Sequence, residues 1–122
     1  MGLNYVPDTN ISIYFLRNVL AAPLPMGDYF LSGITEIELL AKPGLSPTER
    51  AGIRAYVRTM TVVQLPPDVR DEAARIRRDH GLKLPDAIIV ATALSVGAEL
   101  LSNDKQLSRV PGLVVTSLSL KP

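Results

Sequence analysis

Four acidic residues lie at separate points of the chain where an apolar, strand-like segment meets a helix-like one. They are Asp8, Glu38, Asp86 and Asp104. In an open parallel α/β sheet, the carboxyl ends of the strands share one edge, and ligand sites form there. Carboxylates gathered at one edge repel each other and take up protons unless a cation lies between them. The pattern therefore predicts a metal ion held by oxygen ligands.

The composition narrows the choice of metal. The chain has no cysteine, and His80 is its single histidine. These counts exclude a thiolate site and a zinc site built from several imidazoles. Carboxylate oxygens are the ligands that hard divalent cations prefer. The expected cofactor is Mg²⁺ or Mn²⁺.

Each acid also has an ordinary structural interpretation. Asp8 and Asp104 could cap the helical segments that follow them. Glu38 could complete a capping box with Thr35, three residues earlier. Asp86 lies near a helix start, where the helix dipole favours a negative charge. Taken together, the acids favour a functional site more than each does alone. Strongly apolar sequence flanks three of the four, and an unpaired buried carboxylate destabilises a fold strongly. Capping a helix and binding a metal are also compatible roles.

The rest of the sequence predicts a single α/β domain over residues 1–122. Short apolar runs predict strands, and apolar residues at helical spacing predict helices. The expected strands cover residues 3–6, 29–34, 61–65, 99–101 and 113–115. The expected helices cover residues 9–19, 35–41, 47–60, 67–80 and 85–96, with a helical turn at 105–107. This alternation predicts a three-layer α/β/α sandwich around a central, mainly parallel, twisted sheet.

The bulk properties give no further sign of a partner. The 13 basic and 12 acidic residues leave a net charge of +1, which is no global signal for nucleic acid. The longest near-apolar stretch, residues 87–94, is well short of the roughly 18 residues of a membrane span. The N-terminus shows no basic segment followed by an apolar one. We therefore expect a cytoplasmic protein that does not contact membranes.

The sequence around each acid resembles one of the four acidic motifs of PIN domains. The matching segments are Val-Pro-Asp-Thr-Asn at 6–10, Ile-Thr-Glu-Ile-Glu-Leu at 34–39, Leu-Pro-Asp-Ala-Ile-Ile-Val-Ala-Thr-Ala at 84–93 and Leu-Ser-Asn-Asp-Lys at 101–105. The second motif selects Glu38 rather than Glu36, and the third is the most specific. The resemblance extends from Leu3 to Val115. The length of the chain and the spacing of its motifs resemble those of the VapC-type toxins of bacterial and archaeal type II toxin–antitoxin pairs.

This resemblance implies a metal-dependent endoribonuclease in which a metal-activated water attacks an RNA phosphodiester bond. The acids that match the family's catalytic, metal-binding positions are Asp8, Glu38, Asp86 and Asp104. Thr9, Asn10 and Ser102 could orient these ligands or their waters, although local capping and turn bonds explain these three equally well. The implied partners are an RNA substrate, a cognate antitoxin protein and a second copy of the chain in a homodimer. The sequence after the second acid, Ala-Lys-Pro-Gly at 41–44, departs from the family's tight glycine turn.

Two groups of basic residues could bind the RNA backbone. Arg50, Arg54 and Arg58 recur every four residues on one expected helix. The second group precedes the third acidic motif and includes Arg75, Arg78 and Lys83. Arginine contacts to phosphates supply much of the affinity for nucleic acids. A solvated helix face is the alternative interpretation, because charged runs often do no more than face water.

Three other functions remain open. The chain could be an RNA-processing nuclease with no toxicity, or a degenerate RNA- or protein-binding module. All four acids are present, which argues against the degenerate module. A phosphoacceptor regulatory domain also has clustered acids, but that class needs two adjacent acids after the first strand. This chain offers Asp8 alone at that point.

Overall fold

The computed structural model of the protein describes residues 2–122. Its centre is a five-stranded sheet with the order β3-β2-β1-β4-β5. The strands are β1 (Asn4–Pro7), β2 (Asp28–Ser32), β3 (Thr61–Val63), β4 (Glu99–Leu101) and β5 (Val115–Thr116). Every neighbouring pair in this sheet is parallel. The predicted parallel sheet is therefore confirmed.

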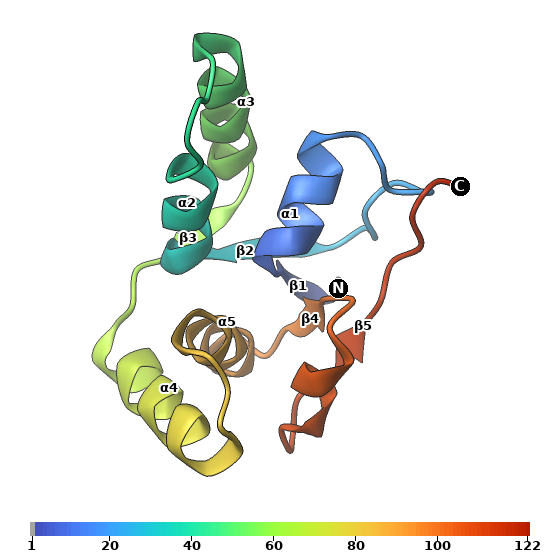
Figure 1. The fold of residues 1–122 in the computed structure, drawn as a ribbon. Coiled ribbons are helices and arrows are strands. Elements are labelled where there is room, and N and C mark those ends of the chain that lie inside the picture. The colour runs from blue at the N-terminus through green and yellow to red at the C-terminus, as the bar shows by residue number, and fades with distance from the viewer. Residues whose placement is uncertain (1) are drawn as a thin grey trace.

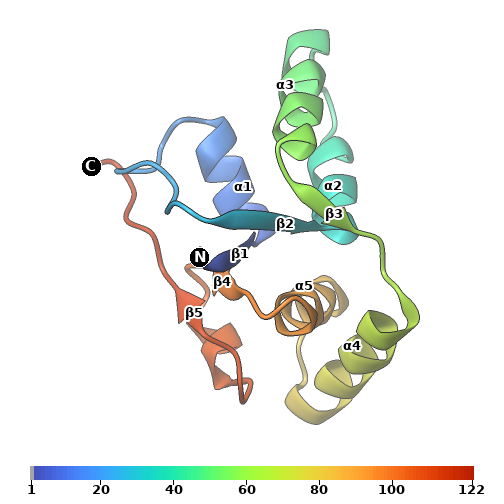
Figure 2. The ribbon, with the colours of Figure 1, turned by 180° about the vertical axis from the view of Figure 1, so that it is seen from behind.

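Helices cover both faces of the sheet. They are α1 (Thr9–Leu16), α2 (Gly33–Leu40), α3 (Pro47–Arg58), α4 (Pro67–His80), α5 (Leu84–Ser95) and the 3₁₀ helix η1 (Lys105–Arg109). Helices α1, α2 and α3 lie on one face, and α4 and α5 lie on the other (Figure 1). Figure 2 shows the same division from behind. The three-layer α/β/α sandwich is confirmed. None of the helices in residues 2–122 is long and apolar enough to span a membrane.

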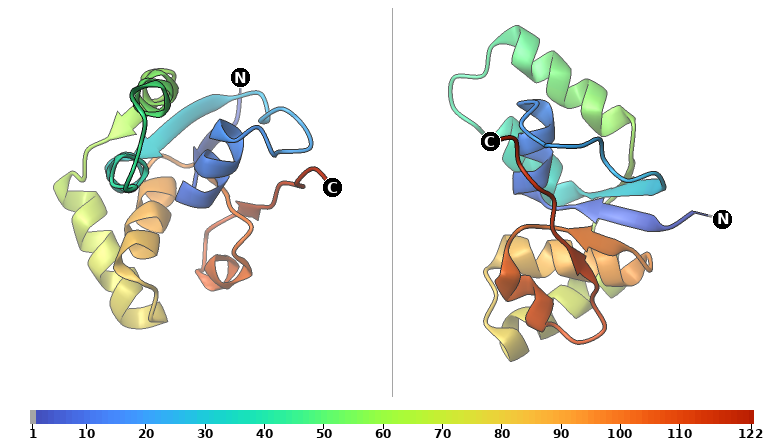
Figure 3. Two further views of the ribbon diagram at one scale, coloured as in Figure 1. Left: turned by 45° about the horizontal axis from the view of Figure 1, so that its top comes forward. Right: turned by 90° about the vertical axis from the view of Figure 1, so that its right-hand side faces the viewer.

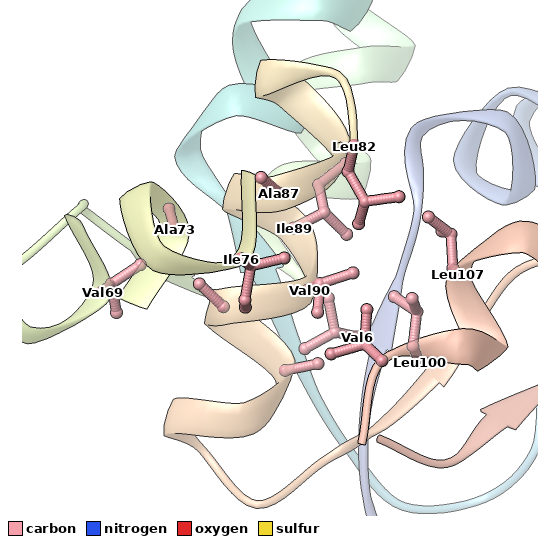
Figure 4. Close-up of a cluster of buried hydrophobic side chains, with 13 residues drawn as sticks. Val6, Val69, Ala73, Ile76, Leu82, Ala87, Ile89, Val90, Leu100 and Leu107 are labelled. Atoms are coloured by element: carbon pink, nitrogen blue, oxygen red, sulfur yellow. The ribbon is translucent and has the colours of Figure 1, made fainter. Parts of the chain in front are cut away.

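The pleat of the strands supplies both faces with apolar side chains. Val6 and Leu100 are paired in register and are fully buried in the cluster that includes α4 and α5 (Figure 4). Their neighbours Tyr5 and Leu101 belong to a separate cluster with Ile11 of α1. This alternation follows from the two-residue period of a strand. Core packing on both faces therefore fixes β1 and β4, whose ends carry two of the acids.

The strand order determines where a ligand site can form. From β1 the sheet continues through β2 to β3 on one side, and through β4 to β5 on the other. The connections therefore change direction between β1 and β4, and this switch point is where open α/β sheets bind ligands, at the carboxyl ends of the strands. Asp8 follows β1, and residues 102–104 follow β4.

The first helix ends earlier than predicted. We expected a helix to residue 19, whereas α1 ends at Leu16. Asn18 takes a left-handed conformation with a φ of 57°. The amide of Asn18 donates to the Phe15 carbonyl, and the amide of Val19 donates to the Tyr14 carbonyl. These two bonds form a Schellman motif, which asparagine can close as well as glycine.

The second helix begins earlier than predicted. Ser32, rather than Thr35, is the N-cap of α2, and its side chain accepts a hydrogen bond from the Ile34 amide. The predicted capping box between Thr35 and Glu38 is therefore wrong. Both side chains are free to face α1 instead.

Several strand boundaries also differ from prediction: β1 is shifted by one residue, and β2 covers Asp28–Ser32 rather than 29–34. β3 stops at Val63 rather than residue 65, and Leu65 has a positive φ of 34°. The last strand is Val115–Thr116 rather than 113–115. None of these shifts moves an acid.

Candidate metal centre

Asp8 occupies the switch point between β1 and β4. Its amide donates to the Leu101 carbonyl at 2.9 Å, which continues the pairing of the two strands by one residue. Its Oδ1 atom accepts from the Ile11 amide at 2.8 Å, so the predicted helix cap is confirmed. The residue is only 7% exposed. Strand pairing and helix capping together hold this carboxylate in the interior.

The surroundings of Asp8 disfavour its charge. Burial raises the pKa of the Asp8 carboxyl, and hydrogen bonds from the Ser102 side chain and the Ile11 amide oppose that rise. The charges of Asp86 and Asp104 raise the pKa further. Asp8 is therefore a buried acid in the field of two other carboxylates, a situation that a nearby cation relieves.

Asp86 is the third residue of α5, directly after Leu84 and Pro85. Burial raises the pKa of Asp86, the charges of Asp104 and Glu38 raise it further, and Lys83 lowers it. Each of the four acids therefore interacts electrostatically with at least one other. Sequence segments that are far apart have been brought to one place, as the parallel sheet predicts.

Glu38 points toward the start of α1. Its Oε1 atom accepts a hydrogen bond of 2.5 Å from the hydroxyl of Thr9. The Thr9 and Thr35 hydroxyl oxygens are 3.2 Å apart, and Thr35 is fully buried. Thr9 therefore orients an acid 29 residues away. Asn10, the next residue of α1, is exposed.

Asp104 is the most exposed of the four acids. It is the N-cap of η1, as predicted. Its Oδ1 atom accepts from the Gln106 amide at 3.0 Å. Its own amide donates to Ser102 Oγ, also at 3.0 Å. The buried Ser102 side chain thus contacts the backbone of Asp104 and the carboxylate of Asp8. Ser102 connects the acid after β1 to the acid after β4.

The four acids match a hard divalent cation in ligand type. All the donors are carboxylate oxygens, the type that Mg²⁺ and Mn²⁺ prefer. Their mutual repulsion raises the pKa of Asp8 and of Asp86. Within residues 2–122, no three acidic or histidine side chains are arranged so that they could hold one ion. Glu38 and Asp104 each direct an oxygen to a protein donor, Thr9 or Gln106.

A cavity of about 300 Å³ opens beside two of the acids. Asp86 and Asp104 line it, together with Lys83 and the start of η1. It lies between the first turn of α5 and η1. The cavity therefore offers room for a ligand next to the carboxylates.

Comparisons with known proteins agree with this geometry. The sequence profile described as "PIN domain" matches residues 5–113, most of the chain. The chain belongs to the PIN domain family. No curated protein sequence matches it significantly.

Several solved structures similar to this PIN domain come from toxin–antitoxin complexes. A toxin–antitoxin complex from Klebsiella pneumoniae contains a chain that is 28% identical, with a TM-score of 0.72, and the match covers 90% of this chain and 95% of that one. A DNA-bound VapBC from Salmonella typhimurium has a TM-score of 0.81 at 22% identity, covering 94% and 98%. VapBC-1 from nontypeable Haemophilus influenzae has a TM-score of 0.75 at 24% identity, also covering 94% and 98%.

The structure places the arginines of α3 outside the cavity that Asp86 and Asp104 line. Arg50, Arg54 and Arg58 are all exposed on α3. Arg58 ends that helix, and two residues separate it from the start of β3, so it lies at the amino edge of the parallel sheet. The acids lie at the carboxyl edge. Figure 1 shows α3 pointing away from α5 and η1.

The second basic group lies closer to the acids, but its members differ. Arg75 is paired with Glu72 at 2.5 Å and with Asp79 at 3.6 Å. Arg78 also approaches Asp79, at 3.6 Å. Lys83 makes no such ion pair within the described residues, and it lines the cavity beside Asp86. Lys83 is therefore the basic residue of this group best placed to meet a ligand of the acids.

Sequence analysis missed two residues that support the site of this PIN domain. Thr35 was assigned to a helix cap, although its spacing of three residues from Glu38 places both on one helix face. Asn103 received no role, because a polar residue in a turn gives no signal of a distant partner. Its side chain bonds the backbone of Leu118, 15 residues later.

Proposed function

We propose that this PIN domain is a Mg²⁺- or Mn²⁺-dependent endoribonuclease and the toxin of a toxin–antitoxin pair. The observation that carries the proposal is the electrostatically coupled group of four acids at the carboxyl edge of the sheet. Asp8 and Asp86 have raised pKa values there because of burial and because of the other acids. Carboxyl groups with perturbed pKa values in a cleft are typical of functional sites. The repulsion among these acids therefore supports a functional role for them.

The acids Asp8, Asp86 and Asp104, with Glu38, would hold the ion. A divalent ion bound there supplies Lewis-acid chemistry, lowering the pKa of a water and neutralising charge that grows on a phosphate. The protein contributes orientation. Thr9 fixes the direction of Glu38 through a hydrogen bond of 2.5 Å.

Lys83 would bind a phosphate of the RNA strand. It is the N-cap residue of α5, it is exposed, and its charge lowers the pKa of Asp86, which places it within electrostatic reach of the site. Lysine binds phosphate as a point charge and needs no fixed partner geometry. A strand that enters the cavity beside Asp86 would therefore meet Lys83 next to the acids.

Lys83→Ala is expected to weaken RNA binding roughly three- to tenfold at low salt and to reduce the slope of log affinity against log salt by about 1. Arg54→Ala is the matched control, because it removes one exposed positive charge from α3, which does not line the cavity beside Asp86. Fluorescence anisotropy with a labelled RNA across a salt series measures both. A larger loss in Arg54→Ala would instead favour the arginines of α3 as the RNA contact.

An antitoxin segment would bind the groove between α1, α2 and α3. A cavity of about 340 Å³ lies there, with an apolar lining and Glu38 among its walls. Apolar residues from all three helices contribute, among them Ile13, Leu39 and Ile53. A segment bound in this groove would cover the approach to Glu38. The structural neighbours named above were solved as complexes with antitoxins, which supports a partner of this kind.

Growth of a bacterial host tests the toxin role. Expression of the chain should arrest growth, and co-expression of the neighbouring gene product should restore it. Cleavage of RNA without growth arrest would favour an RNA-processing nuclease. The homodimer that the resemblance implies remains a prediction, and light scattering of the purified chain tests it.

A further inference from the structure

The last residues of the chain connect two acid-bearing segments. We call residues 116–121 the C-terminal strap. Thr116 accepts a hydrogen bond of 3.1 Å from the Ser102 amide. Leu118 then exchanges two bonds with the side chain of Asn103: its amide donates to Asn103 Oδ1 at 2.8 Å, and its carbonyl accepts from Asn103 Nδ2 at 3.0 Å. The strap is thus hydrogen-bonded to Ser102 and Asn103, the two residues that precede Asp104.

The other end of the strap is fixed to the segment after α1. Ser119 accepts from the Ala21 amide at 2.9 Å, and the Lys121 amide donates to the Val19 carbonyl at 2.8 Å. Leu20 and Leu120 form an antiparallel bridge between these bonds. Figure 3 shows the chain running from β5 to the loop that follows α1. The strap therefore spans from the Asp104 turn to the segment that follows α1.

Leu118 also packs its side chain against a buried cluster that has one member on α1. The members of this cluster are Tyr5, Ile11 and Leu101. Ile11 is the residue whose amide binds the Asp8 carboxylate. The backbone of Leu118 thus holds the Asp104 turn, while its side chain packs against the cluster that contains Ile11.

We propose that Asn103 and the C-terminal strap are a positioning device that sets Asp104 relative to Asp8 for metal binding. This inference rests on the proposed function of the four acids. Asp104 is exposed on a short turn, and its carboxylate otherwise has the local contact to the Gln106 amide. Metal ligands must be held close to one geometry, and supporting residues on rigid elements provide that hold. Asn103 is such a support, because it ties the turn to a strap that is hydrogen-bonded to the segment after α1.

Asn103→Ala in the full-length chain tests the proposal. Loss of an outer-shell contact typically weakens metal binding about 10–100-fold, and we expect about tenfold weaker Mn²⁺ binding by isothermal titration calorimetry. Asn4→Ala is the matched control, because the Asn4 side chain also donates to a distant carbonyl, that of Val96 at 2.9 Å, but at the amino end of β1. Asn4→Ala should retain the wild-type Mn²⁺ affinity even where its melting temperature falls as far. Hydrogen exchange of the Gln106 amide should be faster in Asn103→Ala without metal.

Leu118→Ala weakens the same connection from its other side, without a change in the Asp104 turn. It should lower the Mn²⁺ affinity in the same direction as Asn103→Ala. Wild-type affinity in both variants would overturn the positioning role while leaving the metal site itself intact. No Mn²⁺ binding by the wild-type chain would overturn the proposed function, and this inference with it. An equal loss of affinity in Asn4→Ala would reduce Asn103 to a general contributor to stability.

Discussion

Asp86→Asn is expected to reduce RNA cleavage at least about 100-fold, because a direct ligand should matter more than an outer-shell contact, whose loss costs about 10–100-fold. The same substitution should stabilise the metal-free protein at pH 7. Burial and the charges of Asp104 and Glu38 raise the pKa of Asp86, so its ionised form is disfavoured in the fold. Asparagine keeps the shape and removes the repelled charge.

The stabilising effect should be small, because solvent screens a carboxylate that is partly exposed. We expect a rise in melting temperature of roughly 1–4 °C for a domain of this size. Asp68→Asn is the matched control, since Asp68 lies in the first turn of α4 and is exposed. Asp68→Asn should leave RNA cleavage unchanged and should not raise the melting temperature. Full cleavage by Asp86→Asn would mean that the acids at this edge are not the site.

Mn²⁺ is expected to raise the melting temperature of the wild-type chain strongly at pH 7. At an ion concentration of about 100 times the dissociation constant, binding to the folded state adds about 2.7 kcal/mol. That free energy corresponds to a rise of about 10 °C for a domain of this length. Asp86→Asn should lose most of this rise, although it is the more stable protein without metal.

The increase in melting temperature caused by Mn²⁺ should become smaller as the pH falls. Protons compete with the ion for Asp8 and Asp86, whose pKa values both lie above the ordinary 3.8. Metal stabilisation is therefore full above these raised values and is lost as the pH falls through them. Without metal the sign reverses: a carboxyl with a raised pKa contributes most below its ordinary value, and that contribution is lost as the pH rises through the raised value.

Melting curves with Mn²⁺ and with a chelator, from pH 4 to pH 7.5, measure both trends. The two sets of melting temperatures should diverge as the pH increases. A shift that is constant across the range would contradict a site made of perturbed carboxyls. The Asp68→Asn variant should behave as the wild type in both solutions.

The positions of Asp8 and Asp104 could be predicted because each lies where a strand ends and a helix begins. The same expectation was wrong for Asp86, which follows helix α4, and for Glu38, which is the sixth residue of α2. A strand end followed by a helix start is visible in a few residues, and parallel topology then brings all such junctions to one edge. Asp8 and Asp104 also cap their helices as their residue types suggest. Local sequence preference and the global fold agree at these two points.

The contacts that orient the acids could not be predicted, because they join residues far apart in the chain. Thr9 binds Glu38 across 29 residues, whereas the sequence favoured a cap with the nearby Thr35. The bond between Asn103 and Leu118 depends on the path of a chain end that has no periodic pattern. Helix periodicity grouped the arginines of α3 correctly on one surface, but it carries no information on the distance from that surface to the acids.

The measurement that tests the central claim most directly is 5′-end mapping of total bacterial RNA after incubation with the pure protein. The reactions contain Mg²⁺, Mn²⁺ or a chelator, beside the same series with Asp8→Asn. Asp8 is the most buried of the four acids and connects β1, β4 and α1. We predict discrete new 5′ ends in the wild-type reactions with metal, and none with chelator or with Asp8→Asn. Cuts that persist in the variant or in the chelator, or a wild-type protein that neither cuts RNA nor binds either metal, would contradict the account.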